Sequence, residues 1–279
     1  MKLTDGSAKI VIGLIDGPVL TYHPDLVSER IRTIQGKAER WCTRADSVAC
    51  LHGTFVAGIL CAKRDSAAPG ICPGCTLLAR PIFPETTSGN EPLPSATPEE
   101  LAAAIIESVD AGARLLNLSA ALVQLPSSAG KRALEYALDY AAKRGVIVVV
   151  AGGNQGWVGS TVMTRHPWVI PVAACDLRGR PLSESNLGNS IGRRGLSAPG
   201  EGVSSLASEG KSFASGGTSV AAPFVTAAIA LAWSEFPTAS AAQVRLAVTQ
   251  AHAPRRASVV PPLLNAWAIY QAMTAHSRR

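Results

Sequence analysis

The chain has 279 residues, of which 47% are hydrophobic, 16% charged and 5% aromatic. This composition is typical of a compact globular protein and excludes disorder, collagen and a coiled coil. At this length a single large domain is expected, with a core that needs no disulfides for its stability. The net charge is +6, from 26 Lys and Arg against 20 Asp and Glu. Because the basic clusters are short and lack interleaved aromatic residues, we expect no nucleic-acid binding.

The N-terminal sequence predicts neither an export signal nor a membrane span. Its apolar run, 10–15, has six residues and is followed directly by Asp16, so it is too short for the core of a signal peptide. The longest weakly polar stretch, 219–233, contains Pro223 and falls short of the ~20 residues that a bilayer crossing needs. We therefore expect a cytoplasmic protein with no membrane partner, or an excised domain of a longer polypeptide. The sequence does not indicate the oligomeric state.

Short apolar runs alternate with helical patterns along the chain, and no period of 20 to 50 residues repeats. This predicts an α/β fold, a single-domain doubly wound sheet that is mostly parallel with helices on both faces. Strands are expected at 10–15, 76–82, 114–119 and 146–150. Helices are expected from His52 onward and at 97–112, 131–144, 219–233, 241–251 and 263–273. Loops are expected at 84–98 and from 151 to 210. The single domain, 1–279, has its core at about 9–251 and a C-terminal extension at 252–279.

The six cysteines allow more than one interpretation. Cys42 and Cys50 bracket a short polar loop, whereas Cys72 and Cys75 have a CxxC spacing with no second half of a zinc site. Local disulfides, Cys42–Cys50 and Cys72–Cys75, are the first hypothesis. Free thiols and metal ligation are the alternatives.

Four local patterns carry the chemistry, each at the carboxyl end of an expected strand or the amino end of an expected helix. They are Asp16 followed by Gly17, His52 in HGTFVAG, Asn154 in AGGNQG and Ser219 in GGTSVAAP. Taken singly, they have ordinary structural interpretations: a turn former, a buried histidine, a turn amide and a helix cap. Taken together and in this order, an Asp, a His, an amide donor and a Ser are the parts that acyl transfer requires.

With these residues the sequence resembles the subtilisin-like serine proteases over roughly Lys9 to Trp233. The matching segments are IVIGLIDGPV, HGTFVAGIL, LLNLS, VVVAGGN and GGTSVAAP, and the Asp, His, Ser order is the subtilisin order. The segment GICPGCTLL at 70–78 looks most like the peptidases that process precursor peptides in cyanobactin-type biosynthesis. The resemblance implies a serine endopeptidase that acts through an acyl-enzyme on the leader or recognition segment of a precursor peptide.

The resemblance also implies a role for each of the four residues. Ser219 would be the nucleophile, His52 the general base and then the general acid, and Asp16 the group that orients the imidazole. Asn154, with the backbone N–H of Ser219, would hold the oxyanion. These roles agree with the chemistry, since a serine hydroxyl is too weak an acid to attack an amide without a base in hydrogen-bond reach.

A peptide or protein substrate is expected to bind as an extended strand between two segments of the protein, as it does in the family. One segment would be 119–121 and the other 87–90. The residues assigned to substrate binding are Ser119, Ala120, Ala121, Gly152, Gly153, Ser88 and Gly89. The family commonly has glycine where Ala121 stands, so its methyl group either narrows the groove or merely packs.

The stretch 84–100 carries four glutamates, at 85, 91, 99 and 100, and no Lys or Arg. If this stretch rims the groove, it would favour a basic residue upstream of the scissile bond. Solvated loop charge and helix-dipole matching explain the same residues without selectivity.

No metal and no cofactor are expected, because the stretch between Arg64 and Cys75 has one acid and no Asn, so that a calcium loop frequent in the family is missing. Two other functions stay open. One is a peptide macrocyclase or transamidase, in which an amine resolves the acyl-enzyme. The 35 residues between Asp16 and His52 leave little room for the helical segment that shields such sites in the family. The other is a catalytically silent scaffold that binds peptides, against which the four intact residues argue.

Overall fold

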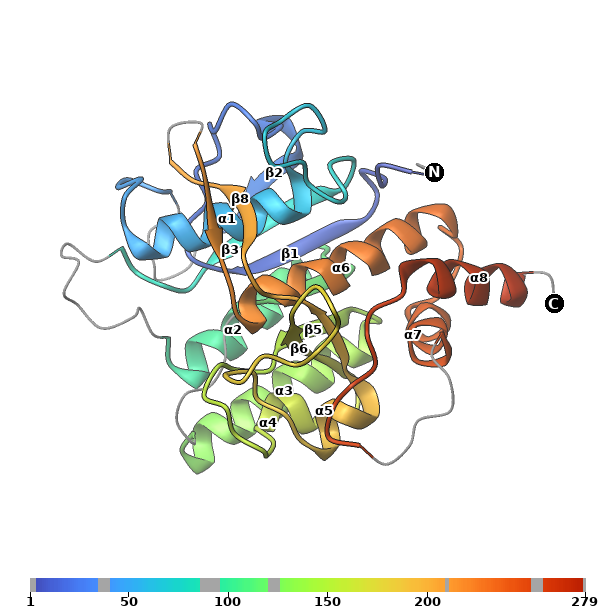
Figure 1. Ribbon diagram of the computed structural model, residues 1–279. Coiled ribbons are helices and arrows are strands. Elements are labelled where there is room, and N and C mark those ends of the chain that lie inside the picture. Colours follow the sequence, from blue (N-terminus) through green and yellow to red (C-terminus); the bar gives the residue numbers. More distant parts are fainter. Residues whose placement is uncertain are drawn as a thin grey trace.

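The structure is a computed structural model that describes residues 4–34, 41–85, 96–119, 126–208, 211–251 and 258–277. Within these residues, a seven-stranded sheet lies between helices on both of its faces (Figure 1). The strand order is β2-β3-β1-β4-β5-β6-β7, and each neighbouring pair is parallel. This confirms the expected doubly wound α/β sheet in a single domain.

The sheet consists of β1 (Val11–Asp16), β2 (Ile31–Thr33), β3 (Thr76–Pro81), β4 (Leu115–Leu118), β5 (Ile147–Ala151), β6 (Val169–Cys175) and β7 (Leu196–Pro199). A separate antiparallel pair is formed by β8 (Val203–Leu206) and β9 (Ser212–Ser215). The helices are α1 (Val48–Cys61), α2 (Pro98–Asp110), α3 (Ser128–Lys143), α4 (Val162–Arg165), α5 (Asn189–Arg194), α6 (Thr218–Glu235), α7 (Ala241–Gln250) and α8 (Ala266–Ser277). A short 3-10 turn, η1 (Ser28–Arg30), precedes β2.

The strand order reverses beside β1, near the centre of the sheet. After β1 the chain forms β2 and β3 on one side, and it then crosses to β4 and continues outward to β7. Ligand sites of open α/β sheets form at such a switch point, beyond the carboxyl ends of the strands. Asp16 ends β1, Ser119 directly follows β4, and Asn154 follows β5 by three residues. The parallel strands therefore bring these three residues to one edge of the sheet.

Two apolar layers hold the helices against the sheet. One layer joins α1, α6, α7 and α8 to residues such as Leu14 and Val149, and the other joins α2 and α3 to residues such as Ile15 and Leu116. Leu14 and Ile15 are neighbours on β1 and point to opposite faces, as the two-residue period of a strand requires. Burial on both faces explains why these strands have continuous apolar sequences.

The expectation of loops between 151 and 210 is wrong. This region contains α4, α5, β6, β7 and β8, and all seven residues of β6 are buried between β5 and β7. The sequence of β6 is VIPVAAC, and its Pro171 pairs with Val150 of β5. Proline lacks an N–H donor and usually argues against a central strand, so it conceals this one in the sequence.

Helix α1 begins at Val48, four residues before the histidine that was expected to open it. The boundary is set by Ser47, whose hydroxyl accepts a hydrogen bond from the backbone N–H of Cys50 at 3.2 Å. Serine is a preferred residue at this position because it satisfies one of the free N–H groups of the first turn. His52 is thus the fifth residue of the helix.

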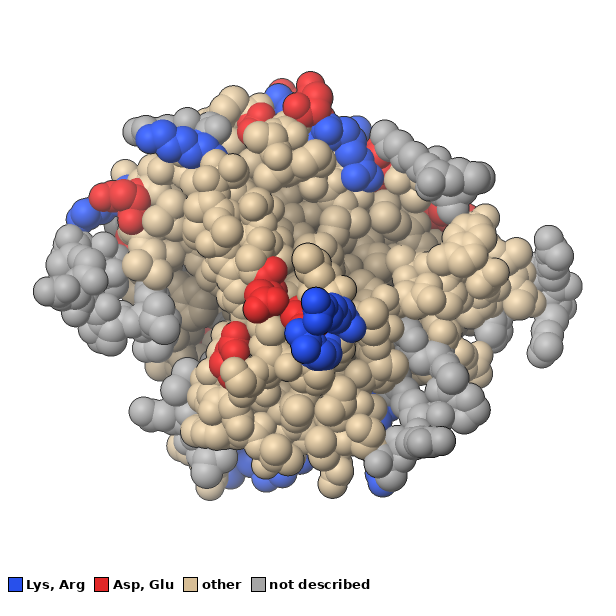
Figure 2. All heavy atoms as spheres, in the orientation of Figure 1, with Lys and Arg blue, Asp and Glu red and all other residues tan. Residues whose placement is uncertain are grey.

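The C-terminal extension packs on the rest of the domain. Helix α8 starts three residues later than expected, and its Ile269 and Met273 are buried in the same apolar layer as α6 and α7. None of the described helices combines the length and apolarity that a bilayer crossing requires. On the face shown in Figure 2, blue basic side chains lie beside red acidic ones at the centre of the view.

The loop between α1 and β3 is fastened by Arg64. Its guanidinium donates to the carboxylate of Asp5 at 2.9 Å and to the backbone carbonyls of Gly70 at 2.8 Å and Ile71 at 2.7 Å. One cationic side chain therefore ties the N-terminal segment and two loop carbonyls together.

Candidate active site

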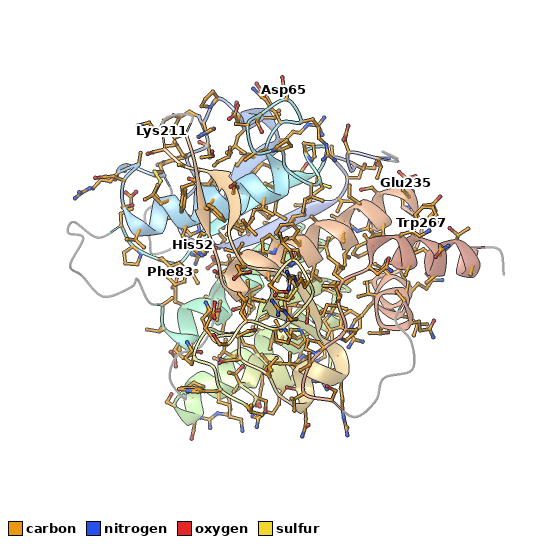
Figure 3. All side chains as sticks on the ribbon, in the orientation of Figure 1. His52, Asp65, Phe83, Lys211, Glu235 and Trp267 are labelled. Atoms are coloured by element: carbon orange, nitrogen blue, oxygen red, sulfur yellow. A yellow bond between two sulfur atoms is a disulfide. The ribbon has the colours of Figure 1, made fainter. Side chains whose placement is uncertain are left out.

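The side chains of Asp16, His52 and Ser219 form one hydrogen-bonded row. His52 Nδ1 lies 2.6 Å from Asp16 Oδ1, and His52 Nε2 lies 3.1 Å from Ser219 Oγ. Asp16 is completely buried, whereas 32% of the His52 side chain is exposed where it projects from α1 (Figure 3). The carboxylate end of the row is closed to water, and the end with the imidazole and the hydroxyl is open to a substrate.

The Asp16 carboxylate determines which nitrogen of His52 carries a proton. Because an ionised carboxylate can only accept hydrogen bonds, the neutral ring is protonated on Nδ1, and Nε2 is the acceptor that faces Ser219. Burial lowers the pKa of His52, but the negative charge of Asp16 and its hydrogen bond raise it by more, so the pKa lies above its ordinary value. The site can therefore stabilise an imidazolium, the form that His52 would take on if it accepted a proton from Ser219.

Two glycines set the distance between α1 and the end of β1. A Cβ atom on Gly53 would lie 2.4 Å from the carbonyl oxygen of Gly17, and one on Gly17 would lie 2.0 Å from the carbonyl oxygen of Ala49. Only residues without a Cβ allow the two backbones to approach so closely. The glycine that follows His52 in HGTFVAG thus holds the imidazole against Asp16.

Ser219 is the second residue of α6, directly after Gly217 and Thr218. N–H groups in the first turn of a helix have no acceptor within the helix. The N–H of Ser219 is thus suited to donate to an oxyanion beside its own side chain. The positive end of the helix dipole favours negative charge at the same place. Gly217 has a φ of +107°, a conformation that residues with a side chain rarely adopt.

The orientation of the Asn154 amide is fixed by Thr218. Asn154 Oδ1 accepts from the Thr218 N–H at 2.8 Å and from the Thr218 hydroxyl at 2.9 Å. Since an N–H can only donate, the oxygen must face Thr218, which leaves Nδ2 as the donor of this exposed residue. The GGTSVAAP motif contains Thr218, but the sequence indicates no role for it, because its partner Asn154 lies 64 residues earlier in the chain.

Ser119 contacts Ser219 and is only 6% exposed. Its hydroxyl donates to the carbonyl oxygen of Ser219 at 3.0 Å and accepts from Asn117 Nδ2 at 2.7 Å. Asn117 in turn accepts from the hydroxyl of Thr226 on α6 at 2.8 Å. The side chain of Ser119 therefore supports the start of α6, and only its backbone is left for a substrate. No motif around Asn117 or Thr226 in the sequence predicts these buried hydrogen bonds.

Gly152 and Gly153 follow β5 and are held by Asn186. The Asn186 amide donates to the Gly152 carbonyl at 3.1 Å, and the Asn186 N–H donates to the Gly153 carbonyl at 2.8 Å. A cavity of about 810 Å³ opens beside Gly152. It is lined by apolar residues that include Trp157 and by two cationic side chains, Lys131 and Arg165. Four further residues assigned to the groove, Ala120, Ala121, Ser88 and Gly89, lie outside the described residues.

The two cysteine pairs differ in their oxidation state. Cys42 and Cys50 form a disulfide, which confirms the first prediction. The predicted Cys72–Cys75 disulfide is wrong, because both thiols are free and fully buried. The Cys72 thiol instead shares hydrogen bonds with Cys61 and Cys75, so each sulfur has a partner without a covalent bond. The hydrogen bonds with Cys61 and Cys75, and then burial, raise the pKa of Cys72 well above its ordinary value.

Two of the four glutamates between 84 and 100 have partners inside the protein. Glu100 pairs with the buried Arg80 at 2.8 Å, and Glu85 accepts hydrogen bonds from residues 43–47. Glu91 lies outside the described residues. Two of the four glutamates in the hypothesis of an acidic rim are therefore engaged by other parts of the protein, which weakens the hypothesis that this stretch selects a basic residue of the substrate.

The model of the subtilase family matches residues 7–263 of this chain. The chain belongs to the subtilase family. Subtilisin DY from Bacillus licheniformis is 31% identical to this subtilase over 244 residues, which cover 85% of this chain and 81% of that protein. Matches to several other subtilisins cover 59% of the relative's length. This subtilase is accordingly a serine protease, the class of hydrolase that the family and these subtilisins share.

Among solved structures, this subtilase is similar to the protease domain of PatA, with a TM-score of 0.87, 29% identity and 99% of both chains covered. It is also similar to the prenylagaramide maturation protease PagA, with a TM-score of 0.83, 26% identity and 98% of this chain and 96% of the other covered.

Proposed function

We propose that this subtilase is an endopeptidase that cleaves a precursor peptide next to its leader or recognition segment, through an acyl-enzyme on Ser219. The observation that carries the proposal is the row of Asp16, His52 and Ser219, with the amide of Asn154 oriented by Thr218, the residue before Ser219. The precursor as substrate is supported by the similarity to PatA and PagA, which are described as patellamide and prenylagaramide maturation proteases.

Each step of the proposed reaction is assigned to particular residues. Ser219 Oγ attacks the carbonyl carbon of the scissile bond while His52 Nε2 takes its proton, and Asp16 stabilises the imidazolium. The tetrahedral oxyanion accepts hydrogen bonds from Asn154 Nδ2 and the N–H of Ser219. His52 then donates its proton to the leaving amine. A water molecule, deprotonated by His52, releases the acyl group in the same way.

The substrate binds as an extended strand along the edge that follows β4. Ser119, the described residue that directly follows β4, supplies main-chain hydrogen bonds to this strand. Gly152 and Gly153 face the residue whose carbonyl is attacked, because they lead directly into Asn154. The cavity of about 810 Å³ beside Gly152 accepts a side chain of this peptide.

Hydrolysis is favoured over macrocyclisation. A cyclase has to shield its acyl-enzyme from water long enough for an amine to attack. Between Asp16 and His52, the described residues form only the turn η1, the short strand β2 and the first residues of α1. The His52 side chain is 32% exposed, which supports access of water to the acyl-enzyme.

Three measurements on the full chain test the proposal. A fluorophosphonate probe should label the protein, and Ser219→Ala should abolish the label. An internally quenched peptide library should then be cleaved, followed by precursor peptides encoded near the gene, with products identified by mass. Linear products support the proposal, and cyclic products would replace it with the macrocyclase. Peptide binding without label or cleavage would leave only the scaffold.

A further inference from the structure

The segment that leads into α1 is held by a single carboxylate. Glu85 lies four residues beyond the end of β3 and two residues after Phe83, which is labelled in Figure 3. Its carboxylate accepts from the N–H of Thr43 at 3.0 Å and the N–H of Arg44 at 3.1 Å. It also accepts from the hydroxyl of Thr43 and, at 3.1 Å, from the hydroxyl of Ser47. Four donors within five residues of chain thus converge on one side chain.

Ser47 connects Glu85 to helix α1. Its hydroxyl donates to Glu85 and at the same time accepts from the N–H of Cys50 in the first turn of α1. The negative charge of Glu85 is therefore placed at the positive end of the helix dipole. His52 follows Cys50 by two residues, so the first turn that Glu85 holds is the one that supports the imidazole.

The Cys42–Cys50 disulfide is a second clamp on the same segment. It joins the residue before Thr43 to the first turn of α1, and both cysteines pack with Leu20 in a small buried cluster. The N–H of Leu20 donates to the hydroxyl of Thr54 on α1 at 2.9 Å. Glu85 and the disulfide thus fix one loop to one helix start by independent means, one electrostatic and one covalent.

The start of α1 has to be held accurately. The contacts of Gly17 and Gly53 leave no space between the helix and the end of β1. Proton transfer from Ser219 needs its hydroxyl within hydrogen-bond reach of His52, and a displacement of about 1 Å can cost about 10²-fold in rate.

We propose that Glu85 is a positioning residue for catalysis, which fixes residues 43–47 and through them the helix that carries His52. Its contribution is largest when the Cys42–Cys50 disulfide is absent, because the two clamps act in parallel. This inference rests on the proposed function, since it concerns the reactivity of Ser219.

The test is a double-mutant cycle on the rate of fluorophosphonate labelling, which reports the Ser219–His52 pair without requiring the peptide groove. Glu85→Gln is compared with the native chain, and again in a Cys42→Ser/Cys50→Ser background. Glu99→Gln, an exposed residue in the first turn of α2, makes the same charge change away from the loop. Melting temperatures are measured in parallel, and labelling is done well below them.

Glu85→Gln should slow labelling about threefold with the disulfide and about tenfold or more without it. Glu99→Gln should stay within about twofold of the native rate, because it leaves the loop intact. A lower melting temperature with an unchanged labelling rate would show that Glu85 is merely structural and would overturn the proposal. Equal effects in the two backgrounds would overturn the parallel action of the clamps.

A second variant decides the matter if Glu85→Gln does not fold. Thr43→Val removes one donor to the carboxylate and keeps the charge. A slower labelling rate at a nearly unchanged melting temperature supports the positioning role, and an unchanged rate contradicts it. If the native chain itself is not labelled, the proposed function fails and this inference with it. If the native chain is labelled and all Glu85 and Thr43 variants match it, only this inference fails.

Discussion

Asn154 and Thr218 are joined through a single oxygen atom. Asn154 Oδ1 receives the backbone N–H of Thr218 at 2.8 Å and its hydroxyl at 2.9 Å. The hydroxyl of Thr218 also accepts from the N–H of Gly153 at 3.0 Å, so the amide is tied to both neighbouring segments. In the proposed mechanism, the Asn154 amide is therefore oriented before a substrate arrives, which is the condition under which an oxyanion donor contributes most.

Asn154→Leu should lower kcat by about 10²–10³ with little change in KM, since loss of one oxyanion donor costs about 2.7–4 kcal/mol in a subtilisin. Thr218→Val keeps the N–H of residue 218 and loses its hydroxyl, so a smaller loss is expected. Steady-state kinetics on one quenched peptide would measure both. A larger loss in the Thr218 variant than in the Asn154 variant would contradict this order.

The second prediction concerns pH. His52 acts as a base only when it is neutral, and Asp16 raises its pKa above 6.5. Activity should therefore be complete at alkaline pH and fall as the pH drops through the raised pKa of His52, before pH 6.5 is reached. Asp16→Asn should move this limb to lower pH and reduce kcat by about 10⁴, because the amide no longer selects the required tautomer. A kcat/KM profile for both proteins tests this, and an identical acidic limb in the two would refute the assignment.

The third prediction concerns Gly53. An added methyl group would overlap the carbonyl oxygens of Gly17 and Pro18, both at 2.5 Å or less. Gly53→Ala should push α1 away from β1, lengthen the contact between His52 and Asp16, and destabilise the fold by about 1–3 kcal/mol. Activity should fall by more than the folded fraction does. Gly112→Ala is a control, because nothing lies near its Cβ position, although its positive φ adds some strain. Urea unfolding and labelling rates, measured together, would separate the two effects.

The fourth prediction concerns the buried Arg80, which pairs with Glu100 at 2.8 Å and Glu107 at 2.6 Å. Arg80→Met leaves the nearly buried charge of Glu100 without a partner and should cost about 3–5 kcal/mol of unfolding free energy. Arg80→Met with Glu100→Gln should recover a large part of this loss. Denaturant unfolding in a Ser219→Ala background avoids self-digestion during the measurement. A double variant as unstable as the single one would show that the loss comes from packing.

Much of the fold could be predicted because its determinants are local. The strands β1, β3, β4 and β5 are buried on both faces and so have continuous apolar sequences. Asp16, His52, Asn154 and Ser219 each lie within a short motif. The sequence does not predict strand β6, because Pro171 interrupts its apolar pattern. The strand forms in the folded protein, where Pro171 pairs with Val150 of β5.

What the sequence could not indicate depends on partners far along the chain. Glu85 looked like one charge in an acidic loop, and its partners are about 40 residues earlier. Ser119 was assigned to the groove, whereas its side chain supports Ser219, 100 residues away. Residues about 40 or 100 positions apart share no periodic pattern in the sequence. These two sets of contacts therefore become evident only in the folded structure.

The contacts of Arg64 with the loop between α1 and β3 affect the susceptibility of this enzyme to autolysis. Any peptidase encounters neighbouring copies of itself, and a loosened surface loop is an attractive cleavage site for them. Here the cation that gathers Asp5 and two loop carbonyls is part of the polypeptide, so dilution or a chelator cannot remove it. We therefore expect the resistance of this loop to autolysis to persist in a chelator, and only the exposed Arg64–Asp5 pair to weaken with added salt.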